Sequence, residues 1–446
     1  MNKYYQKIVL LSNNEVVKNI ILVASITLLI SFLGFFKEML VASYFGLSLV
    51  LDTFFIAILV PGFIQSVFIS SFKSVFIPNY IAETKTGNSL DSFQGTGLLI
   101  TSVISLAFII IAFIFTDTYL EFFFSGHNEE YYGLVKAQFY ILLPCVFFWG
   151  VSSLLSGILN ISGEFKLTSF EGIFIPISII IIIYFFEDYF DKLILAVGTL
   201  TGTILAFLFL VFISIKKKTI RIARPNLKNH NAILMFKQIP AKISSGFLTG
   251  MNGVIDQFFA AQLIIGSISA INYSLKIPAF LISILVVAIT NVLLPKFSKM
   301  IMENRENAFK YWLKIIKTLF IAASICAFIG IILSDFLVKL FFERNEFTES
   351  DSIVVSNLQQ IFLVYTPFTI CGMVSVNFLT SMNKNVVMAY ISFVAVILNG
   401  ILDFFLIKYY GVYGIAICTT LVVIIKNIAL FYSVIHYKKL DTKYKI

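Results

Sequence analysis

Long apolar stretches alternate with short polar links along almost the whole chain, from near residue 18 to near residue 435. Each stretch reaches about 20 residues, the length that a helix needs to cross a bilayer. Residues 177–184, for example, do not alternate between apolar and polar side chains as the strands of a membrane barrel do. The pattern therefore predicts an all-α polytopic membrane protein with about 12 transmembrane helices, at residues 17–46, 51–80, 95–116, 134–160, 167–186, 191–215, 233–263, 267–295, 309–334, 353–381, 386–408 and 411–436.

Proline spacing indicates that the chain contains two copies of one module. Pro61 and Pro78 recur as Pro278 and Pro295, in both cases 217 positions later. Other segments match in the same order: residues 120–133 with 338–352, Pro144 with Pro367, and residues 161–165 with 381–385.

The repeat predicts two domains. Each copy holds six spans, so both copies have the same orientation, and we expect two six-helix bundles related by a pseudo-twofold axis along the membrane normal. The N-terminal bundle is expected at residues 1–215, a basic cytoplasmic linker at 216–231 and the C-terminal bundle at 232–446. Paired bundles of this kind commonly enclose a substrate site that opens to one side of the membrane at a time, which is alternating access.

Charge distribution predicts the orientation of the chain. Only 13% of its residues are charged, against about 25% in soluble domains. One set of links and ends holds twenty Lys and Arg, whereas the other set holds four and carries acidic stretches at 117–130 and 343–351. The positive-inside rule then places both termini in the cytoplasm. The N-terminal residues show no cleavage site after a short apolar core, so we expect no removed signal peptide.

The net charge of +9 follows mostly from this bias, so we expect no nucleic-acid partner. The run KKKTIRIARPNLK at 216–228 has the composition of a solvated cytoplasmic linker. Contact of this run with anionic lipid headgroups is the alternative.

Cysteine and histidine give no sign of a metal site or a catalytic centre. The four cysteines lie singly within apolar runs, where free Cys commonly behaves as a small hydrophobe. The three histidines fall at segment ends or in links. No nucleotide-binding loop is present, so direct ATP coupling is not expected. We expect no cofactor, and coupling to Na⁺, to H⁺ or to the membrane potential remains open.

The order of several motifs resembles the lipid II flippases (MurJ/MviN-like) and the related O-antigen flippases (Wzx-like) of the multidrug/oligosaccharidyl-lipid/polysaccharide exporter superfamily. The resemblance extends over roughly residues 16–435. Its motifs are GFFKEMLVASYFG (34–46), LDTFF (51–55), VPGF (60–63), FIPNY (76–80), VIDQFFAAQL (254–263), GSISAINYSLK (266–276), LLPKFSK (293–299) and LFFERNEFTESD (340–351).

The chain also departs from the lipid II flippases. Those proteins usually have fourteen spans, and the missing pair helps to form their groove for the lipid tail. Where they often carry an Arg pair after the proline of the second span, this chain has Gln65 and Ser66, and where they have Arg in the first and eighth spans it has Lys37 and Lys276. By the resemblance, these departures favour a dedicated flippase for polysaccharide units.

Charged residues inside the spans are the candidate site, because a charge at membrane depth is costly and is a functional hypothesis by default. Lys37 lies deep in the first span and Lys276 early in the eighth, where both would meet a diphosphate in a central cavity. The alternative is a lysine that snorkels to the surface. The full set of predicted substrate-binding residues is Lys37, Lys276, Asp52, Lys73, Asn272 and Tyr273, with Asp52 included mainly for its match to the family.

Asp256 and Glu38 are the predicted gating or ion-coupling residues. Asp256 follows Lys37 by 219 positions, so opposite charges occupy equivalent places in the two halves. A structural pair between Asp256 and a nearby lysine is the other interpretation. Glu171 and Lys426, near the predicted inner ends of their spans, are expected to be interfacial.

The resemblance implies a flippase that moves an undecaprenyl-diphosphate-linked saccharide, either a polysaccharide repeat unit or a lipid II-like molecule, across the bacterial cytoplasmic (inner) membrane. It would be a secondary-type transporter and not an enzyme. Its partners would be that lipid-linked saccharide diphosphate, membrane lipids and, as a further option, polysaccharide-assembly proteins. A multidrug/cation antiporter of the same superfamily is the alternative, but its cavity should be acidic, whereas the deep charges here are mainly lysines. A membrane polymerase or ligase is less favoured, because the long outer links hold one His and one Arg between them.

Overall fold

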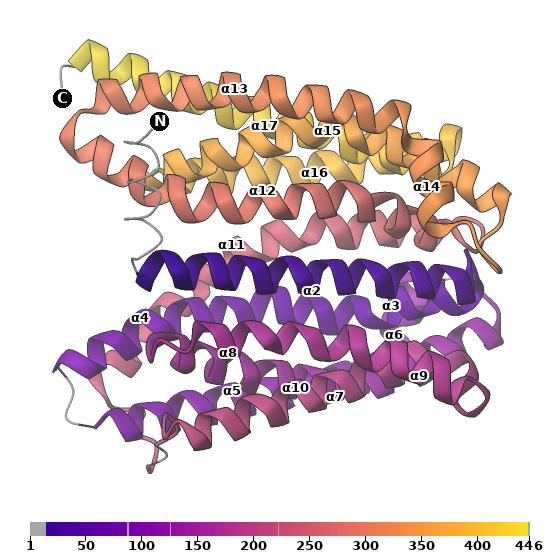
Figure 1. The fold of residues 1–446 in the computed structure, drawn as a ribbon, viewed down its shortest axis with the longest axis horizontal. Helices are drawn as coiled ribbons and strands as arrows, with labels where there is room; N and C mark the ends of the chain where they lie inside the picture. Colours follow the sequence, from indigo (N-terminus) through magenta and orange to yellow (C-terminus); the bar gives the residue numbers. More distant parts are fainter. Residues whose placement is uncertain (1–14, 87–88, 125, 222, 445–446) are drawn as a thin grey trace, which may run out of the picture. The chain divides into compact units, whose positions relative to one another are not determined.

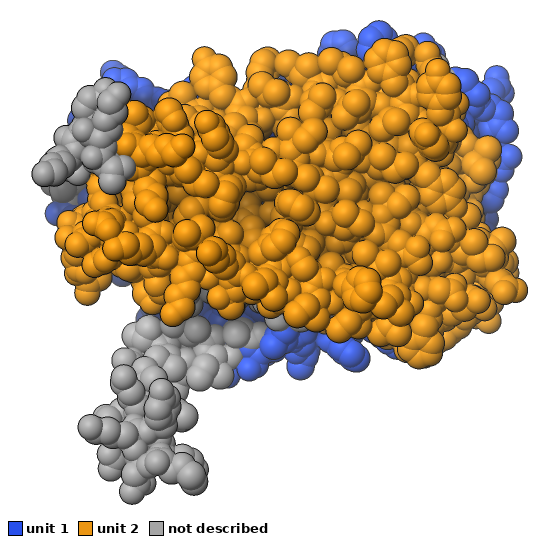
Figure 2. All heavy atoms as spheres, turned by 90° about the horizontal axis from the view of Figure 1, so that it is seen from above, with its two compact units in different colours: residues 1–40, 53–250 blue, residues 41–52, 251–446 orange. Residues whose placement is uncertain are grey.

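The computed structural model of the protein describes residues 15–86, 89–124, 126–221 and 223–444 (Figure 1). Those residues form helices joined by short turns, with one isolated β-bridge between Arg344 and Phe347 and no named strand. The predicted all-α class is confirmed. The described helices divide between two compact units, which are coloured separately in Figure 2.

Unit 1 comprises Met1–Leu40 and Thr53–Gly250, and unit 2 comprises Val41–Asp52 and Met251–Ile446. The elements of unit 1 are α2 (Glu15–Phe45, to residue 40), α3 (Leu49–Ile64, from residue 53), the π-helix η1 (Gln65–Ile69), α4 (Ser70–Thr86), α5 (Leu90–Ile114), α6 (Thr116–Phe123), α7 (Glu129–Ile161), α8 (Phe165–Ser169), η2 (Phe170–Ile173), α9 (Phe174–Phe190), η3 (Asp191–Leu193), α10 (Ile194–Lys216) and α11 (His230–Ala260, to residue 250). Unit 2 holds the remaining turns of α2, α3 and α11, with α12 (Ser267–Glu303), α13 (Arg305–Ile332), α14 (Ser334–Phe342), α15 (Glu349–Ser381), α16 (Asn385–Tyr410) and α17 (Val412–Tyr444).

Every predicted span corresponds to one helix or to two or three consecutive helical elements. Nine stretches of the described residues are long and apolar enough to cross a membrane, and one of them, Phe165–Lys216, contains two predicted spans. Helices α11 and α12 do not meet this criterion within the described part of the chain, so their crossing remains a prediction. Most helices extend past the predicted limits, because a helix can continue in polar surroundings after its apolar stretch has ended.

Left-handed backbone positions show the repeat in the structure. Three pairs of residues with positive φ lie 220 positions apart: Gly46 with Gly266, Gly163 with Asn383, and Asp191 with Gly411. Each pair marks the same kind of turn in the two halves, namely a link between consecutive long helices. The repeat that the prolines indicated is therefore also present in the turns.

The helix geometry next to Pro61 compensates for the backbone hydrogen bond that a proline removes. Pro61 lies in α3 four residues before η1, the π-helical segment that continues into α4. A proline removes one backbone donor, and a local change of helix type lets the neighbouring carbonyls find other partners. Pro144 lies in α7 and Pro367 in α15. Each of these helices has 33 residues and follows a short helix, α6 and α14 respectively.

The core of unit 1 shows how α4, α5 and α7 are held together. The rings of Phe76 and Phe93 stack with centroids 5.5 Å apart, and both side chains are buried. Gly97 allows this packing, because a Cβ there would lie 2.3 Å from the ring of Phe76. In unit 2, Trp312 and Phe378 occupy a comparable core with centroids 5.8 Å apart.

The link between α2 and α3 packs within unit 2, although it belongs to the first half of the sequence repeat. Ser43 accepts a hydrogen bond from the backbone N–H of Glu346 at 3.1 Å, and its hydroxyl accepts one from Asn345 Nδ2 at 2.8 Å. Residues 230–250 of α11 pack in unit 1, as does the basic segment that precedes them. The two compact units reflect which segments pack together, and the division of the chain into two bundles at 215 and 231 stays a prediction.

Gly46 provides a direct test of this packing. Its φ is +52°, and a Cβ there would lie 2.3 Å from the carbonyl oxygen of Glu346. We expect Gly46→Ala to lower the free energy of unfolding by more than the roughly 1–2 kcal/mol of left-handed strain alone. Gly411→Ala is the control for strain without a clash, since its φ is +54° and nothing lies within 4 Å of its Cβ position. The unfolding temperature in detergent should be highest for the wild type, lower for Gly411→Ala and lowest for Gly46→Ala. Equal losses in the two variants would contradict the proposed contact.

Candidate functional site

The charged pair of α2 lies in unit 1, inside the span Ser25–Phe45. Lys37 Nζ donates a hydrogen bond to Glu38 Oε1 at 2.5 Å, and the two side chains are 18% and 15% exposed. Adjacent residues of a helix do not normally face each other, so this contact uses the length of both side chains. Lys37 is the predicted anion ligand, and in this arrangement an anion would have to compete with Glu38.

A second lysine of unit 1, Lys73, lies on α4 within the span Leu49–Lys85 and is half-buried. It interacts electrostatically with Glu171 of η2, a half-buried carboxylate of the stretch Phe165–Lys216. Its Cε lies 3.9 Å from the Cβ position of Gly157 on α7, so the absence of a side chain there leaves room for the lysine. The structure therefore brings together two charges that the sequence analysis treated separately.

Asp52 is a structural ligand of a helix start in unit 2. Its carboxylate accepts hydrogen bonds from the backbone N–H of Gly266 at 2.7 Å, from the N–H of Ser269 at 2.8 Å and from the hydroxyl of Ser269 at 2.5 Å. The first N–H groups of a helix lack partners within the helix, and a carboxylate there is favoured by the helix dipole. Asp52 is only 3% exposed, and both its oxygens are engaged by the start of α12.

The other predicted residues of α12 differ in their surroundings. Tyr273 is fully buried, and its ring packs against Phe342 at 5.2 Å and Phe347 at 5.7 Å between centroids. It is therefore part of the core of unit 2. Asn272 donates a hydrogen bond to the carbonyl of Ile268 within its own helix, at 2.9 Å, and both Asn272 and Lys276 are half-buried.

Asp256 belongs to a polar cluster formed by α11, α16 and α17 in unit 2. Its Oδ1 accepts a hydrogen bond from Asn399 Nδ2 at 2.7 Å, and its Oδ2 accepts one from the Thr419 hydroxyl at 2.9 Å. The same amide nitrogen of Asn399 donates to Asp403 Oδ2 at 2.9 Å. One amide thus holds two carboxylates together, and we call Asp256, Asn399, Asp403 and Thr419 the carboxylate cluster.

The carboxylate cluster lacks a cation from the protein. Among the described residues, no lysine or arginine forms an ion pair with Asp256 or Asp403, so a structural pair between Asp256 and a lysine is not found. Asp403 is fully buried, and its Oδ1 has no hydrogen-bond partner among those residues. Asp403 is fully buried and Asp256 half-buried, and two carboxylates held by one amide cannot both carry an uncompensated charge, so they favour a shared proton or a bound cation.

The sequence analysis missed three members of this cluster. Asn399 and Asp403 lie four positions apart in the otherwise apolar helix α16, a spacing that puts both on one face of the helix. That spacing could have identified the two residues as a candidate site from the sequence. Thr419 had no comparable signal, because a threonine in an apolar helix commonly bonds to its own backbone, as Thr419 also does to the carbonyl of Ile415 at 3.0 Å.

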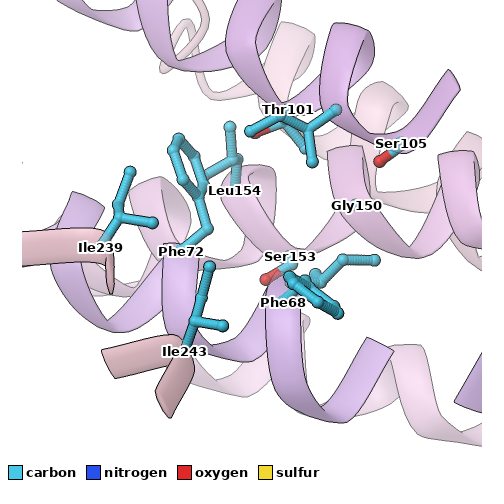
Figure 3. Close-up of a pocket in the computed structure, with 11 residues that line it drawn as sticks. Phe68, Phe72, Thr101, Ser105, Gly150, Ser153, Leu154, Ile239 and Ile243 are labelled. Carbon is cyan, nitrogen blue, oxygen red and sulfur yellow. The ribbon is translucent and has the colours of Figure 1, made fainter. Parts of the chain in front are cut away.

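A separate pocket lies within unit 1, between η1, α4, α5, α7 and the first half of α11 (Figure 3). Its walls are apolar side chains such as Phe68, Phe72 and Ile243, together with the hydroxyl-bearing residues Thr101 and Ser153. The hydroxyl of Thr101 already donates to the carbonyl of Gly97 at 2.9 Å. The pocket contains no charged residue, so it offers nothing to a phosphate.

Taken together, the helical architecture and its long apolar spans define a polytopic helical membrane protein. Solved structures have the same fold. An inward-facing multidrug transporter of the MOP superfamily superimposes with a TM-score of 0.76, at 15% identity, over 95% of this chain and 99% of that chain. A lipid II flippase MurJ in an inward closed conformation superimposes with a TM-score of 0.78, at 24% identity, over 93% of this chain and 87% of that chain. These likenesses show the fold.

The sequence defines the family more narrowly. The family model described as "Lipid II flippase MurJ" matches residues 41–445, so this chain belongs to the MurJ family of lipid II flippases. It is 28% identical to a probable lipid II flippase of Buchnera aphidicola over 91% of this chain and 81% of that protein. It is also 28% identical to the lipid II flippase of Thermosipho africanus over 90% of this chain and 82% of that protein, and 24% identical to a probable one of Vibrio cholerae.

The role of Asp52 can be tested by stability. Asp52→Ala leaves the N–H groups of Gly266 and Ser269 buried without an acceptor, which costs about 1–3 kcal/mol beyond the loss of an ordinary cap. We expect a lower unfolding temperature and faster amide exchange over residues 264–270. Asn304→Ala removes an exposed cap from α13 and is the control, with a loss of about 1 kcal/mol or less. A variant Asp52→Ala that unfolds like wild type but transports poorly would instead indicate contact with the substrate.

Proposed function

We propose that this protein moves a lipid-linked saccharide diphosphate from the inner to the outer leaflet of the bacterial cytoplasmic membrane by alternating access. Membership of the lipid II flippase family supports the substrate class. The observation that carries the proposal is the presence of half-buried lysines within the helices, Lys37 on α2, Lys73 on α4 and Lys276 on α12. A charge at membrane depth is costly and is a functional-site hypothesis by default, and the diphosphate would be the anion that these lysines meet during transport.

The chemistry of a diphosphate fits these lysines. A diphosphate carries several negative charges, and leaving them unpaired at low dielectric would cost many kcal/mol. An ammonium group on a flexible stem can follow a phosphate through a large motion, whereas arginine holds one planar geometry. In this mechanism Lys37 leaves Glu38 when the diphosphate arrives and returns to it when the diphosphate leaves. Glu38 would therefore keep the lysine neutralised in the empty transporter.

The saccharide could be that of lipid II or of a polysaccharide repeat unit. The family favours lipid II, as do the names of its relatives. Gln65 and Ser66 favour the other, since they stand at the exposed start of η1 where an Arg pair is common in lipid II flippases. Depletion of the protein distinguishes the two candidate substrates, because only one of the two lipid intermediates should accumulate in the inner leaflet.

Replacement of the lysines tests the proposal. In depleted cells, Lys37→Ala and Lys276→Ala should restore little transport, while Lys37→Arg and Lys276→Arg should restore part of it, because the charge is kept. Lys299→Ala is the matched control, since Lys299 is exposed and pairs with Glu303 at the surface. Inner-leaflet accumulation of the lipid-linked saccharide is the measurement. Full transport by the Lys37→Ala, Lys276→Ala double variant would overturn the site, and unchanged intermediates with lost resistance to cationic dyes would favour the antiporter.

We further propose that the carboxylate cluster couples transport to a cation, either Na⁺ or a proton. Carboxylate, amide and hydroxyl oxygens are hard ligands that suit such ions. The supporting observations are the shared amide of Asn399, the buried free oxygen of Asp403 and the absence of a basic partner among the described residues. Cation binding would replace the proton that the two carboxylates otherwise share.

A thermal shift with salt and pH tests this second proposal. If Na⁺ binds, each tenfold increase in saturating Na⁺ should add about 1.4 kcal/mol to the free energy of unfolding, whereas K⁺ at equal ionic strength should not. Asp403→Asn should abolish the effect, and Asp351→Asn, which changes an exposed carboxylate at the start of α15, should retain it. Proton coupling predicts a pH dependence that Asp403→Asn removes, without an Na⁺ effect. A wild type that shows neither an Na⁺ dependence nor a pH dependence would contradict the proposal.

A further inference from the structure

The basic segment between the two halves of the repeat is held in a fixed course on unit 1. We call residues 217–228 the basic strap, and the structure describes all of them except residue 222. The strap begins where α10 ends. Lys218 has a φ of +54°, the N–H of Lys218 donates to the carbonyl of Ile215, and the N–H of Thr219 donates to the carbonyl of Ser214. This is a helix-ending turn in which glycine is the usual residue, and here a lysine occupies it.

Hydrogen bonds then hold the backbone of the strap against the first turns of α5. Gln94 acts as a clamp, because its Nε2 donates to the carbonyl of Thr219 at 3.0 Å while its Oε1 accepts from the N–H of Arg221 at 2.8 Å. Ser92 Oγ donates to the carbonyl of Arg224 at 2.8 Å, and Thr96 Oγ1 accepts from the N–H of Asn226 at 2.9 Å.

The fit of the strap against α5 is close. A Cβ at Gly95 would lie 2.3 Å from the carbonyl oxygen of Ala223, so only glycine allows the approach. At the far end, Asn229 caps the start of α11 with its side-chain oxygen and donates to Glu83 Oε1 at 2.9 Å. The strap is therefore an ordered surface, although its composition suggested a solvated linker.

Not all cations of the strap form ion pairs within the described part of the chain. Lys218, Arg224 and Lys228 are exposed, and none of them forms an ion pair with an acidic side chain in the part of the chain that the structure describes. Lys217 differs, because it pairs with Glu164 at 2.5 Å. The backbone of Arg224 is bonded to the first turn of α5, where the helix dipole is positive, so the fold gains nothing from a cation there.

The strap lies at the level where two membrane spans end. The span Phe165–Lys216 ends one residue before it, and the span Leu90–Ile114 begins beside it. Leu227, between the two cations Arg224 and Lys228, is 52% exposed. Basic side chains around an exposed apolar one, at the edge of a bilayer, fit the boundary between anionic headgroups and acyl chains.

We propose that the basic strap binds the phosphate headgroups of anionic phospholipids, with Lys218, Arg224 and Lys228 as the ligands and Leu227 inserted among the acyl chains. Each juxtamembrane cation adds about 1 kcal/mol to the attraction of an anionic bilayer. Because the backbone is already ordered, binding costs little loss of chain entropy. The exposed leucine favours a lipid over an acidic polypeptide. The proposal does not depend on the identity of the flipped substrate.

The test uses the full-length protein in nanodiscs of phosphatidylcholine with a minor fraction of phosphatidylglycerol, with native mass spectrometry of the lipids that stay bound. Wild type should retain phosphatidylglycerol in preference to phosphatidylcholine, and the preference should weaken with salt. The double variant Arg224→Gln, Lys228→Gln should lower the apparent affinity for phosphatidylglycerol about 30-fold, as expected for the loss of two interfacial cations.

The control is the double variant Lys299→Gln, Lys310→Gln, which removes two exposed lysines that each have a glutamate four residues away on their helix. It should keep the preference. Lys218→Gly is a second strap variant that suits the left-handed turn, so it should fold at least as well as wild type while losing about fivefold in affinity. Equal retention of phosphatidylglycerol in wild type and strap variants, or an equal loss in the control, would overturn the proposal; either result would also be expected of a surface for an acidic polypeptide.

Discussion

The cost of placing a charge inside an apolar helix bundle determines most of what this structure shows. An ionised group at membrane depth must find an opposite charge, a set of hydrogen-bond donors or a ligand. The structure shows the first two of these solutions. Lys37 is neutralised by its neighbour Glu38, and Asp52 is neutralised by the N–H groups at the start of α12. The carboxylate cluster has hydrogen-bond donors but no basic partner among the described residues, so it is the place where an ion from outside is most needed.

The internal repeat allows the charges of the two halves of the chain to be compared position by position. Turns with positive φ recur 220 positions apart, so the two halves share a backbone plan. The charges do not follow that plan, since the residue 220 positions after Lys37 is the uncharged Gln257, and its neighbour Asp256 carries the opposite charge. Asp52 and Ser269 are themselves 217 positions apart and are hydrogen-bonded to each other. A duplicated scaffold has thus acquired different chemistry at equivalent positions, with a cationic first half and an acidic cluster in the second.

The sequence was sufficient to predict the features that depend on local pattern. The helical class, the helix for each span and the repeat all follow from apolar runs and proline spacing. Features that depend on which helices become neighbours could not be read in this way. Thr419 joins Asp256 only because α11 and α17 meet, and Tyr273 is a core residue only because Phe342 and Phe347 surround it. The order of the basic strap depends on Gln94, a residue with no special signal in its own helix.

The central claim is that buried lysines select the negative charge of the lipid that is flipped. The most direct measurement uses proteoliposomes and two synthetic lipids with the same saccharide and the same isoprenoid chain, one linked through a diphosphate and the other through an uncharged linker. Outer-leaflet appearance of each lipid is followed with a membrane-impermeant sugar-binding probe. The account predicts that wild type flips the diphosphate much faster than the uncharged lipid and that Lys276→Ala removes this preference. Equal rates for the two lipids in wild type, or an unchanged preference in Lys276→Ala, would contradict it.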